Sequence, residues 1–134
     1  MATSIRAFNV DLYQEHLLEA AFLYQHRVKL LLDPEIRWRD LVEVEDRLEA
    51  HIDALVIGED LAIEVCRARA KSGDSGELFP AISVFCRQRR ADLVSEALAG
   101  SDFTDGDKVA AIEDALKHEL PNEWMGYCGE ALAR

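Results

Sequence analysis

The stretch Asp40–Ile57, DLVEVEDRLEAHIDALVI, decides the fold that this sequence predicts. Placed on an α-helix at about 100° per residue, its apolar side chains fall within about 80° of one another. They are Leu41, Val44, Leu48, Ile52 and Leu55. A stripe of this kind is typical of a helix that packs one face against a core. We therefore expect 40–57 to be the central helix of the domain.

A second line of side chains on the same stretch is acidic and borders the apolar stripe. This acidic ridge consists of Glu45, Asp46, Glu49 and Asp53. Carboxylates three or four residues apart on a helix repel each other by roughly 0.2–0.5 kcal/mol per pair unless a cation lies between them. Because the fold has no evident need of such a ridge, we expect a cationic partner to bind it. The alternative is a solvated face that Arg37, Arg39 or Arg47 partly neutralises.

Length and composition indicate one helical domain over residues 1–134. A chain of 134 residues can bury a core without disulfides or a metal. Hydrophobic residues make up 49% and charged residues 31%, which excludes a disordered chain. Three prolines and seven glycines are few, long stretches consist of strong helix formers, and no run alternates apolar and polar residues. The predicted class is all-α.

The net charge of −11 argues against two classes of partner, nucleic acids and anionic membrane surfaces, because both attract basic proteins. The acidic excess is concentrated in residues 33–60, where ten acids stand against three arginines and supply −7 of the −11. This segment ends with Glu59 and Asp60, which we add to the ridge as candidate partner-binding residues. The predicted partner is a basic protein, and the oligomeric state is left open.

The cysteines and the N-terminus bear on the compartment. Cys66, Cys86 and Cys128 are odd in number and widely spaced, which fits neither a disulfide framework nor a zinc site. The first residues, MATSIRAFNVDLYQ, lack the continuous apolar segment of a signal peptide, and no later run is long enough to span a membrane. We expect a cytoplasmic protein with reduced thiols.

An antiparallel helix pair is predicted over 1–57. The first helix is expected to begin at a cap on Asn9 or Asp11 and to end near residue 32, before Pro34. Leu18 and Phe22 widen its apolar stripe to about half the circumference, so we expect it to be covered on more than one side. In the connection that follows, Trp38 is expected to pack as an anchor.

Short helices separated by short turns are predicted over 58–134, at about 59–70, 77–89, 91–98 and 108–119. Gly58 is expected to end the preceding helix as a C′ residue, and Pro80 to lie in a first turn. The repeated pattern is typical of HEAT-like helical hairpins and gives six to seven helices in all. The tail 122–134, a weak amphipathic helix, either folds back on the domain or leads into a longer array.

Residues that could support catalysis are few. Glu15, Glu19 and His26 share one face of the first helix and could supply metal ligands, but the repeated Glu-x-x-His motifs of a di-iron bundle are missing. His51 is expected to be a partly buried, hydrogen-bonded histidine. No phosphate-binding loop, nucleophile elbow or zinc-protease motif occurs. We therefore predict no enzyme, no metal and no cofactor.

Two segments carry a resemblance to a known family. EAAFLY (19–24) and RLEAHIDAL (47–55), within roughly the first 90 residues, resemble the N-terminal region of a bacterial family related to HEAT-repeat proteins. This resemblance implies an interaction protein, since some members are encoded beside type VI secretion effectors, where an immunity role is implied. It carries over no catalytic residues, and relatives extend through more helical repeats than this chain.

The acidic surface and the resemblance together favour one class of function. Nucleases have basic active sites because they bind phosphate, so a protein that blocks one tends to be acidic. The leading prediction is a cytoplasmic immunity protein that neutralises a basic toxin, such as a type VI secretion nuclease. The alternative is an acidic helical adaptor or scaffold without a toxin partner. An enzyme or metal carrier that uses Glu15, Glu19 and His26 is the third class.

Overall fold

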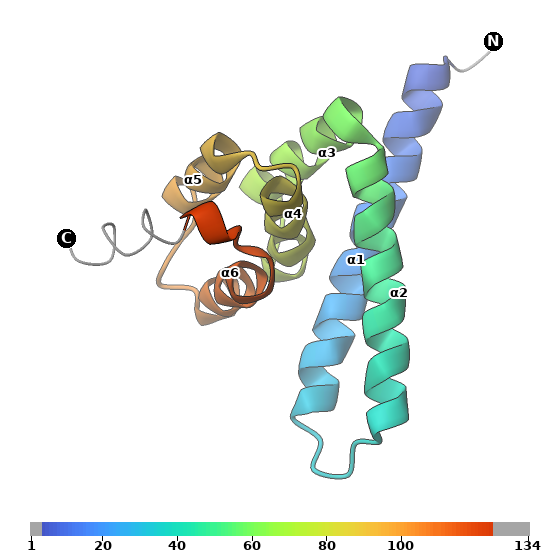
Figure 1. Ribbon diagram of the computed structural model, residues 1–134, viewed down its shortest axis with the longest axis vertical. Coiled ribbons are helices and arrows are strands. Elements are labelled where there is room, and N and C mark those ends of the chain that lie inside the picture. Colours follow the sequence, from blue (N-terminus) through green and yellow to red (C-terminus); the bar gives the residue numbers. More distant parts are fainter. Residues whose placement is uncertain (1–3, 125–134) are drawn as a thin grey trace.

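The computed structural model describes residues 4–124, which form six α-helices and no strand (Figure 1). The elements are α1 (Ile5–Leu31), α2 (Trp38–Ile57), α3 (Glu59–Ser72), α4 (Ser75–Arg87), α5 (Ala91–Ala99), α6 (Gly106–Glu119) and the 3-10 turn η1 (Asn122–Trp124). The all-α class and the expected number of helices are confirmed. None of these helices is long and apolar enough to cross a membrane.

The N-terminal pair is antiparallel, as predicted (Figure 1). The first helix begins earlier than expected, at Ile5, because the Ser4 side chain accepts a hydrogen bond from the Ala7 amide and caps it. The sequence prediction chose Asn9 or Asp11 as the cap, but both lie inside the helix. The extra turns carry the start of α1 past the end of α2.

The predicted core face of α2 is confirmed in full. The buried residues of α2 are Leu41, Val44, Leu48, Ile52 and Leu55. The predicted anchor is wrong, because the Trp38 side chain is 78% exposed at the start of the helix. The predicted widening of the α1 stripe is wrong, because Leu18 and Phe22 are 48% and 62% exposed. The helix α1 nevertheless packs against α2, α3 and α4, which bury a face that includes Leu17 and Tyr24.

Gly58 ends α2, as expected, but it does not adopt the left-handed conformation typical of a C′ glycine. Gly58 has ordinary helical angles, with φ −69°, and the left-handed residue is Glu59, with φ 51°. Gly58 is required by space, because a Cβ atom there would lie 2.7 Å from the Ala62 Cβ and from two ring atoms of Tyr13. The glycine thus lets the α2–α3 joint pack closely against α1.

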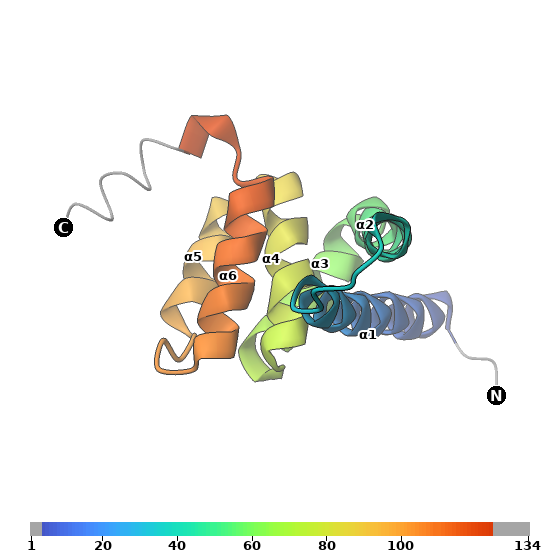
Figure 2. The ribbon, with the colours of Figure 1, turned by 90° about the horizontal axis from the view of Figure 1, so that it is seen from below.

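The centre of the fold is α4, not the 40–57 stretch. Every residue from Gly76 to Cys86 is buried, and α4 packs against α1, α2, α3, α5 and α6. Figure 2 shows α4 between α3 and α6. Pro80 lies in the second turn of α4 rather than the first, since the helix begins at Ser75 after the Asp74 cap. The connection between the helices expected at 59–70 and 77–89 is therefore shorter, with α3 ending at Ser72 and α4 beginning at Ser75.

The C-terminal helices assemble around α4. The Asp105 side chain caps α6, which therefore begins at Gly106, two residues before the expected start at 108. One buried core cluster includes residues from all six helices, so the segments 5–57 and 59–119 share it. Of the predicted tail helix, only η1 lies in the described part, where Trp124 packs against the core; residues 125–134, including Cys128, lie outside the described residues.

Candidate functional site

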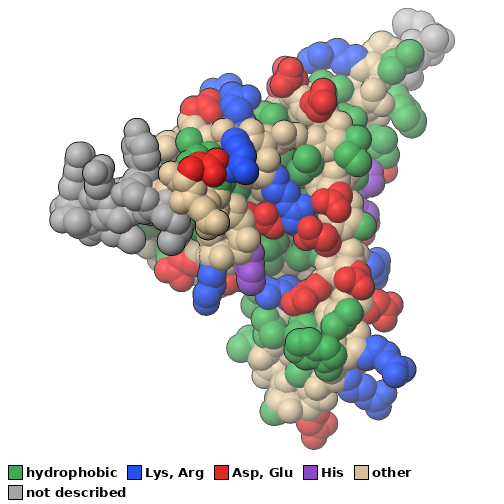
Figure 3. All heavy atoms as spheres, viewed as in Figure 1, with side chains coloured by type: hydrophobic (Ala, Val, Ile, Leu, Met, Phe, Trp, Pro, Cys, Tyr) green, Lys and Arg blue, Asp and Glu red, His purple; other side chains and the backbone are tan. Residues whose placement is uncertain are grey.

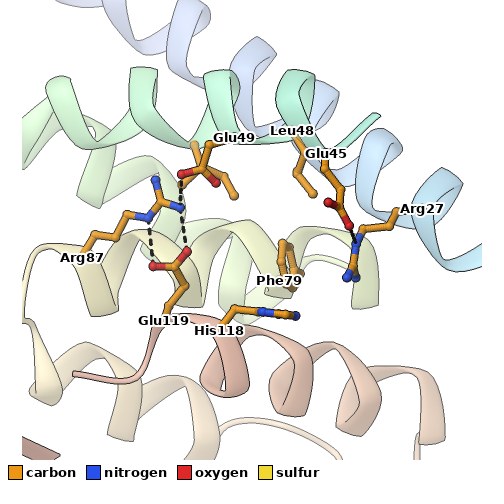
Figure 4. A pocket seen from close by; sticks show the side chains of 9 residues that line it. Arg27, Glu45, Leu48, Glu49, Phe79, Arg87, His118 and Glu119 are labelled. Carbon is orange, nitrogen blue, oxygen red and sulfur yellow. Dashed lines mark hydrogen bonds and ion pairs between the residues drawn. The ribbon is translucent and has the colours of Figure 1, made fainter. Parts of the chain in front are cut away.

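A cleft of about 310 Å³ opens where α1, α2, α4 and α6 meet (Figure 4). Its walls combine apolar side chains with ion pairs at both ends. The lining residues are Arg27, Glu45, Leu48, Glu49, Ile52, Phe79, Arg87, His118 and Glu119. Helices from the first and the last quarter of the chain thus contribute to one site.

One end of the cleft is organised by Arg87, whose side chain is only 17% exposed. Its Nη2 lies 2.6 Å from a carboxylate oxygen of Glu49, and its Nη1 donates to Asp53 at 2.7 Å. Glu119 accepts two further bonds, from Nε at 3.0 Å and from Nη2 at 2.6 Å. The bonds to Glu119 and Glu49 outweigh burial and raise the pKa of Arg87 above its ordinary value. One guanidinium therefore ties α2, α4 and α6 together.

The other end of the cleft is closed by Arg27 of α1. Its Nε donates to Glu45 of α2 at 3.0 Å, and the arginine side chain is 15% exposed while the glutamate is 44% exposed. The pair links the two long helices at the point where they face α4 (Figure 4).

The floor between these two ends is apolar. Leu48 and Ile52 from α2 and Phe79 from α4 are buried there. Behind the floor, the Phe79 ring stacks on Tyr24, with centroids 4.3 Å apart and planes within 9°. The Tyr24 hydroxyl donates to Asp114 of α6 at 2.7 Å; burial and this bond raise the Tyr24 pKa. The floor is therefore held rigidly by three helices.

The charge balance of the site favours the binding of a cationic group. The four carboxylates of Glu45, Glu49, Asp53 and Glu119 face two guanidinium groups, which leaves a balance of −2. Both arginines are largely buried and engaged, whereas the side chains of Glu45, Glu49 and Asp53 are 44–59% exposed. Figure 3 shows acidic and basic side chains meeting along this side of α2. Carboxylate oxygens of the site are thus accessible to solvent, whereas few of the guanidinium N–H groups are accessible.

The predicted acidic ridge is brought into this site only in part. Glu45 and Glu49 line the cleft, and Asp53 joins the Arg87 cluster. The expectation that the fold has no need of the ridge is wrong, because three of its four carboxylates bind arginines of other helices. Those arginines are Arg27 and Arg87, not the neighbours on the same segment that the alternative named.

The remaining predicted residues lie apart from the ion pairs. Asp46 is exposed on α2, and Glu59 and Asp60 are exposed at the start of α3, outside the cleft lining. Within residues 4–124, none of these three forms an ion pair. They are the members of the predicted set that no cation of the described residues pairs with directly, although Asp60 lies close enough to help raise the Arg90 pKa.

Sequence reasoning missed most of the cleft. Arg27 carried a signal, because on the helical wheel it falls inside the apolar stripe of α1, where an arginine requires an acidic partner from another helix. Arg87 lies in a run with Arg89 and Arg90 that looks like one basic group. In the structure Arg89 binds Glu123 and Arg90 binds Asp92, so the three arginines serve different partners. Nothing in the sequence placed Glu119 beside Arg87.

The structure does not assemble the third class of site. Within residues 4–124, no three His, Cys, Asp or Glu side chains gather as metal ligands, so Glu15, Glu19 and His26 form no such group. His51 is partly buried and hydrogen-bonded, as predicted, and its partner is His16, with Nδ1 atoms 3.0 Å apart. Burial, and then the facing His16 ring, lower the His51 pKa.

Comparisons of the chain with protein-family models, with curated proteins and with solved structures found no match. The resemblance to the HEAT-related bacterial family therefore stays a prediction, and a functional proposal depends on the geometry of the chain itself.

Proposed function

We propose that this protein is a binding module that recognises a basic protein through the cleft between α1, α2, α4 and α6. The observation that carries the proposal is the asymmetry of charge in the cleft. Its two arginines are buried in ion pairs, while the carboxylates that outnumber them keep exposed oxygens. Such a site attracts cations and offers few donors to a phosphate or carboxylate.

The shape of the cleft suits a lysine or arginine side chain from the partner. The aliphatic part of such a side chain would lie on Leu48 and Phe79, and its charged end would reach Glu45 or Glu49. An aromatic floor beneath a cation adds an attraction of about 0.5–2 kcal/mol. The overall charge of −11 would accelerate the approach of a basic protein.

Within this class, the function favoured by the sequence is that of a cytoplasmic immunity protein. It would bind a basic toxin, such as a type VI secretion nuclease, and block its phosphate-binding active site. The acidity of the chain and its resemblance to the HEAT-related family support this choice. The proposal requires no catalysis, metal or cofactor.

The second candidate is an acidic adaptor or scaffold without a toxin partner. The observation that favours it is the use of Glu49 and Asp53 to neutralise the buried Arg87. Under this alternative the ridge is structural on its inner side and solubilising on its outer side.

The test uses a carboxylate that the fold does not need. Replacing Glu49 or Asp53 with lysine would place a second cation beside Arg87 and would destabilise the fold. A loss of binding could then not be distinguished from a loss of stability. We therefore choose Asp46→Lys, on the acidic ridge of α2 but outside the cleft lining, and Glu113→Lys on α6 as a control with the same change in charge; both acids are exposed and neither forms an ion pair within residues 4–124.

The experiment captures partners from the source cell with the tagged protein and measures association with the captured basic protein by stopped flow at two ionic strengths. Asp46→Lys is expected to lower the on-rate and to flatten its salt dependence, while Glu113→Lys is expected to leave both near the wild-type values. Equal effects of the two variants would mean that the ridge is only a solvated face. Co-expression then separates the two candidates, because an immunity protein relieves the toxicity of the captured protein and an adaptor does not.

A further inference from the structure

Between Ile5 and Phe22, the helix α1 carries five large apolar side chains that are exposed to solvent. They lie at spacings of three, four, six and four residues along the helix. This α1 outer stripe consists of Ile5 (81% exposed), Phe8 (62%), Leu12 (36%), Leu18 (48%) and Phe22 (62%). Figure 1 shows the N-terminal turns of α1 projecting beyond the end of α2, with no described element beside them.

The fold makes no use of the α1 outer stripe. None of its five residues belongs to the core cluster or packs against it, although Val10 and Tyr13 of the same helix do. The solvent face of a surface helix is ordinarily polar, and several neighbouring exposed aromatic and aliphatic residues are typical of an interaction site. Figure 3 shows apolar side chains on the projecting N-terminal turns of α1.

Acidic side chains share this face. At about 100° per residue, Asp11, Glu15 and Glu19 fall among the directions of the stripe residues. All three are exposed, and no Lys or Arg of residues 4–124 forms an ion pair with any of them. The face therefore combines apolar side chains with three carboxylates that pair with no lysine or arginine of residues 4–124, although Glu19 acts on the partly buried His51 of α2.

These charges decide between two occupants. A second copy of the chain would pair the stripe with itself and bring two sets of Asp11, Glu15 and Glu19 together, which is unfavourable. A partner helix with apolar residues on one face, flanked by lysines or arginines, fits this surface better. Its apolar face would cover the exposed α1 side chains, and its cations would pair with Asp11, Glu15 and Glu19.

We propose that the α1 outer stripe is a docking surface for a basic amphipathic helix. Ile5 to Phe22 spans about 26 Å, which a partner helix of about 17 residues matches in length. The inference rests on the proposed function for the basic character of the partner, but it assigns a contact to α1 residues that do not line the cleft, so each surface is testable separately.

The probe is a synthetic 18-residue peptide of Leu and Lys with leucines at helical spacing, and a scrambled peptide of the same composition is its control. Binding is measured by fluorescence anisotropy and peptide helicity by circular dichroism. Wild-type protein is expected to bind the amphipathic peptide at least about tenfold more tightly than the scrambled one and to make it helical.

The double variant Phe8→Glu with Phe22→Glu is expected to weaken this binding by at least about tenfold. Ile57→Glu with Phe103→Glu is the matched control, because these apolar residues are 79% and 61% exposed outside α1; it is expected to change binding by less than about twofold. Circular dichroism of both variants checks that the fold is retained.

Equal loss in the two double variants, or equal binding of the two peptides, would overturn the proposal, because either result indicates attraction by charge alone. Sedimentation showing a dimer that only the α1 variant dissociates would also overturn it in favour of self-association. The acidic-ridge variant Asp46→Lys separates the two proposals: if it leaves partner association unchanged while the α1 variant abolishes peptide binding, the cleft function fails and the docking surface stands.

Discussion

Arg87 and Glu119, 32 residues apart in the chain, form a two-point ion pair in which the Nε and Nη2 atoms donate to the two carboxylate oxygens at 3.0 and 2.6 Å. Both side chains are largely buried, at 17% and 20% exposed, and Glu49 shares the same guanidinium. The pair holds α6 to α4 at the mouth of the cleft, so binding and stability depend on the same residues.

Arg87→Met should lower the free energy of unfolding by about 2–4 kcal/mol, because it leaves the carboxylates of Glu49, Asp53 and Glu119 close together without a cation. Urea denaturation measures the change. Arg89→Met is the control, since its pair with Glu123 has both side chains more than half exposed and should contribute less than about 1 kcal/mol. Equal effects would mean that the Arg87 cluster is solvated in solution.

Leu48→Ala should cost about 2–5 kcal/mol, because the side chain is 5% exposed and its removal leaves a cavity in the core under the cleft. The control is Val42→Ala on the same helix, where the side chain is 36% exposed and the loss should stay below about 1 kcal/mol. A loss below about 1 kcal/mol at Leu48 would place this face of α2 in solvent.

Gly58→Ala should destabilise the protein by about 1–3 kcal/mol, because the added methyl group would lie 2.7 Å from the Tyr13 ring and the Ala62 Cβ. Gly106→Ala, at a position with no neighbouring atom within 4 Å of the added Cβ, should be neutral or slightly stabilising. Thermal unfolding of the two variants compares them. An unchanged melting temperature for Gly58→Ala would refute the close contact.

The His51 site should make stability depend on pH. Burial, then the His16 ring and Arg47, lower its pKa in the folded state, against an opposing effect of Glu19. The unfolded chain therefore binds more protons just below about pH 6.5, and stability should fall as the pH falls through this window. His51→Gln should reduce this dependence in denaturation measured at about pH 7.5 and about pH 5.5. His26→Gln, on an exposed residue, should leave it unchanged.

The Cys66 thiol should be unreactive in the folded protein. It is fully buried, and burial raises its pKa to about 12, so almost no thiolate is present near neutral pH. Iodoacetamide at about pH 8, followed by peptide mapping, should label Cys66 only after denaturation. Labelling at the same rate in native and denatured protein would show that the site opens readily.

The sequence predicted the parts of the fold that depend on local periodicity. The five core residues of α2 repeat at helical spacing within one element, so the wheel identifies them without knowledge of the partner helix. The range expected for α6, about 108–119, was likewise readable from local sequence. For the same reason, the wheel misplaced Leu18 and Phe22, because apolar character alone does not show whether a neighbouring helix exists to cover a face.

The candidate site was predictable only by half, because it depends on contacts between distant elements. The carboxylates of Glu45 and Glu49 are visible as a ridge, but their partners Arg27 and Arg87 lie 18 and 38 positions away in the chain. The central position of α4 was equally hidden. Its apolar residues are conspicuous, yet only the packing of five other helices around it shows that it is surrounded.

The burial of α4 sets the order in which the growing chain acquires its structure. The helices that cover Gly76–Cys86 come from both sides of it in the sequence, so the core faces of α1, α2 and α3 stay without their main contact until residue 87 has been synthesised. The face of α4 that packs against α6 stays exposed until α6, which ends at Glu119, has been synthesised. A chain made from its N-terminus thus exposes apolar surface until α6 has been synthesised, because only then do all the described helices around α4 exist.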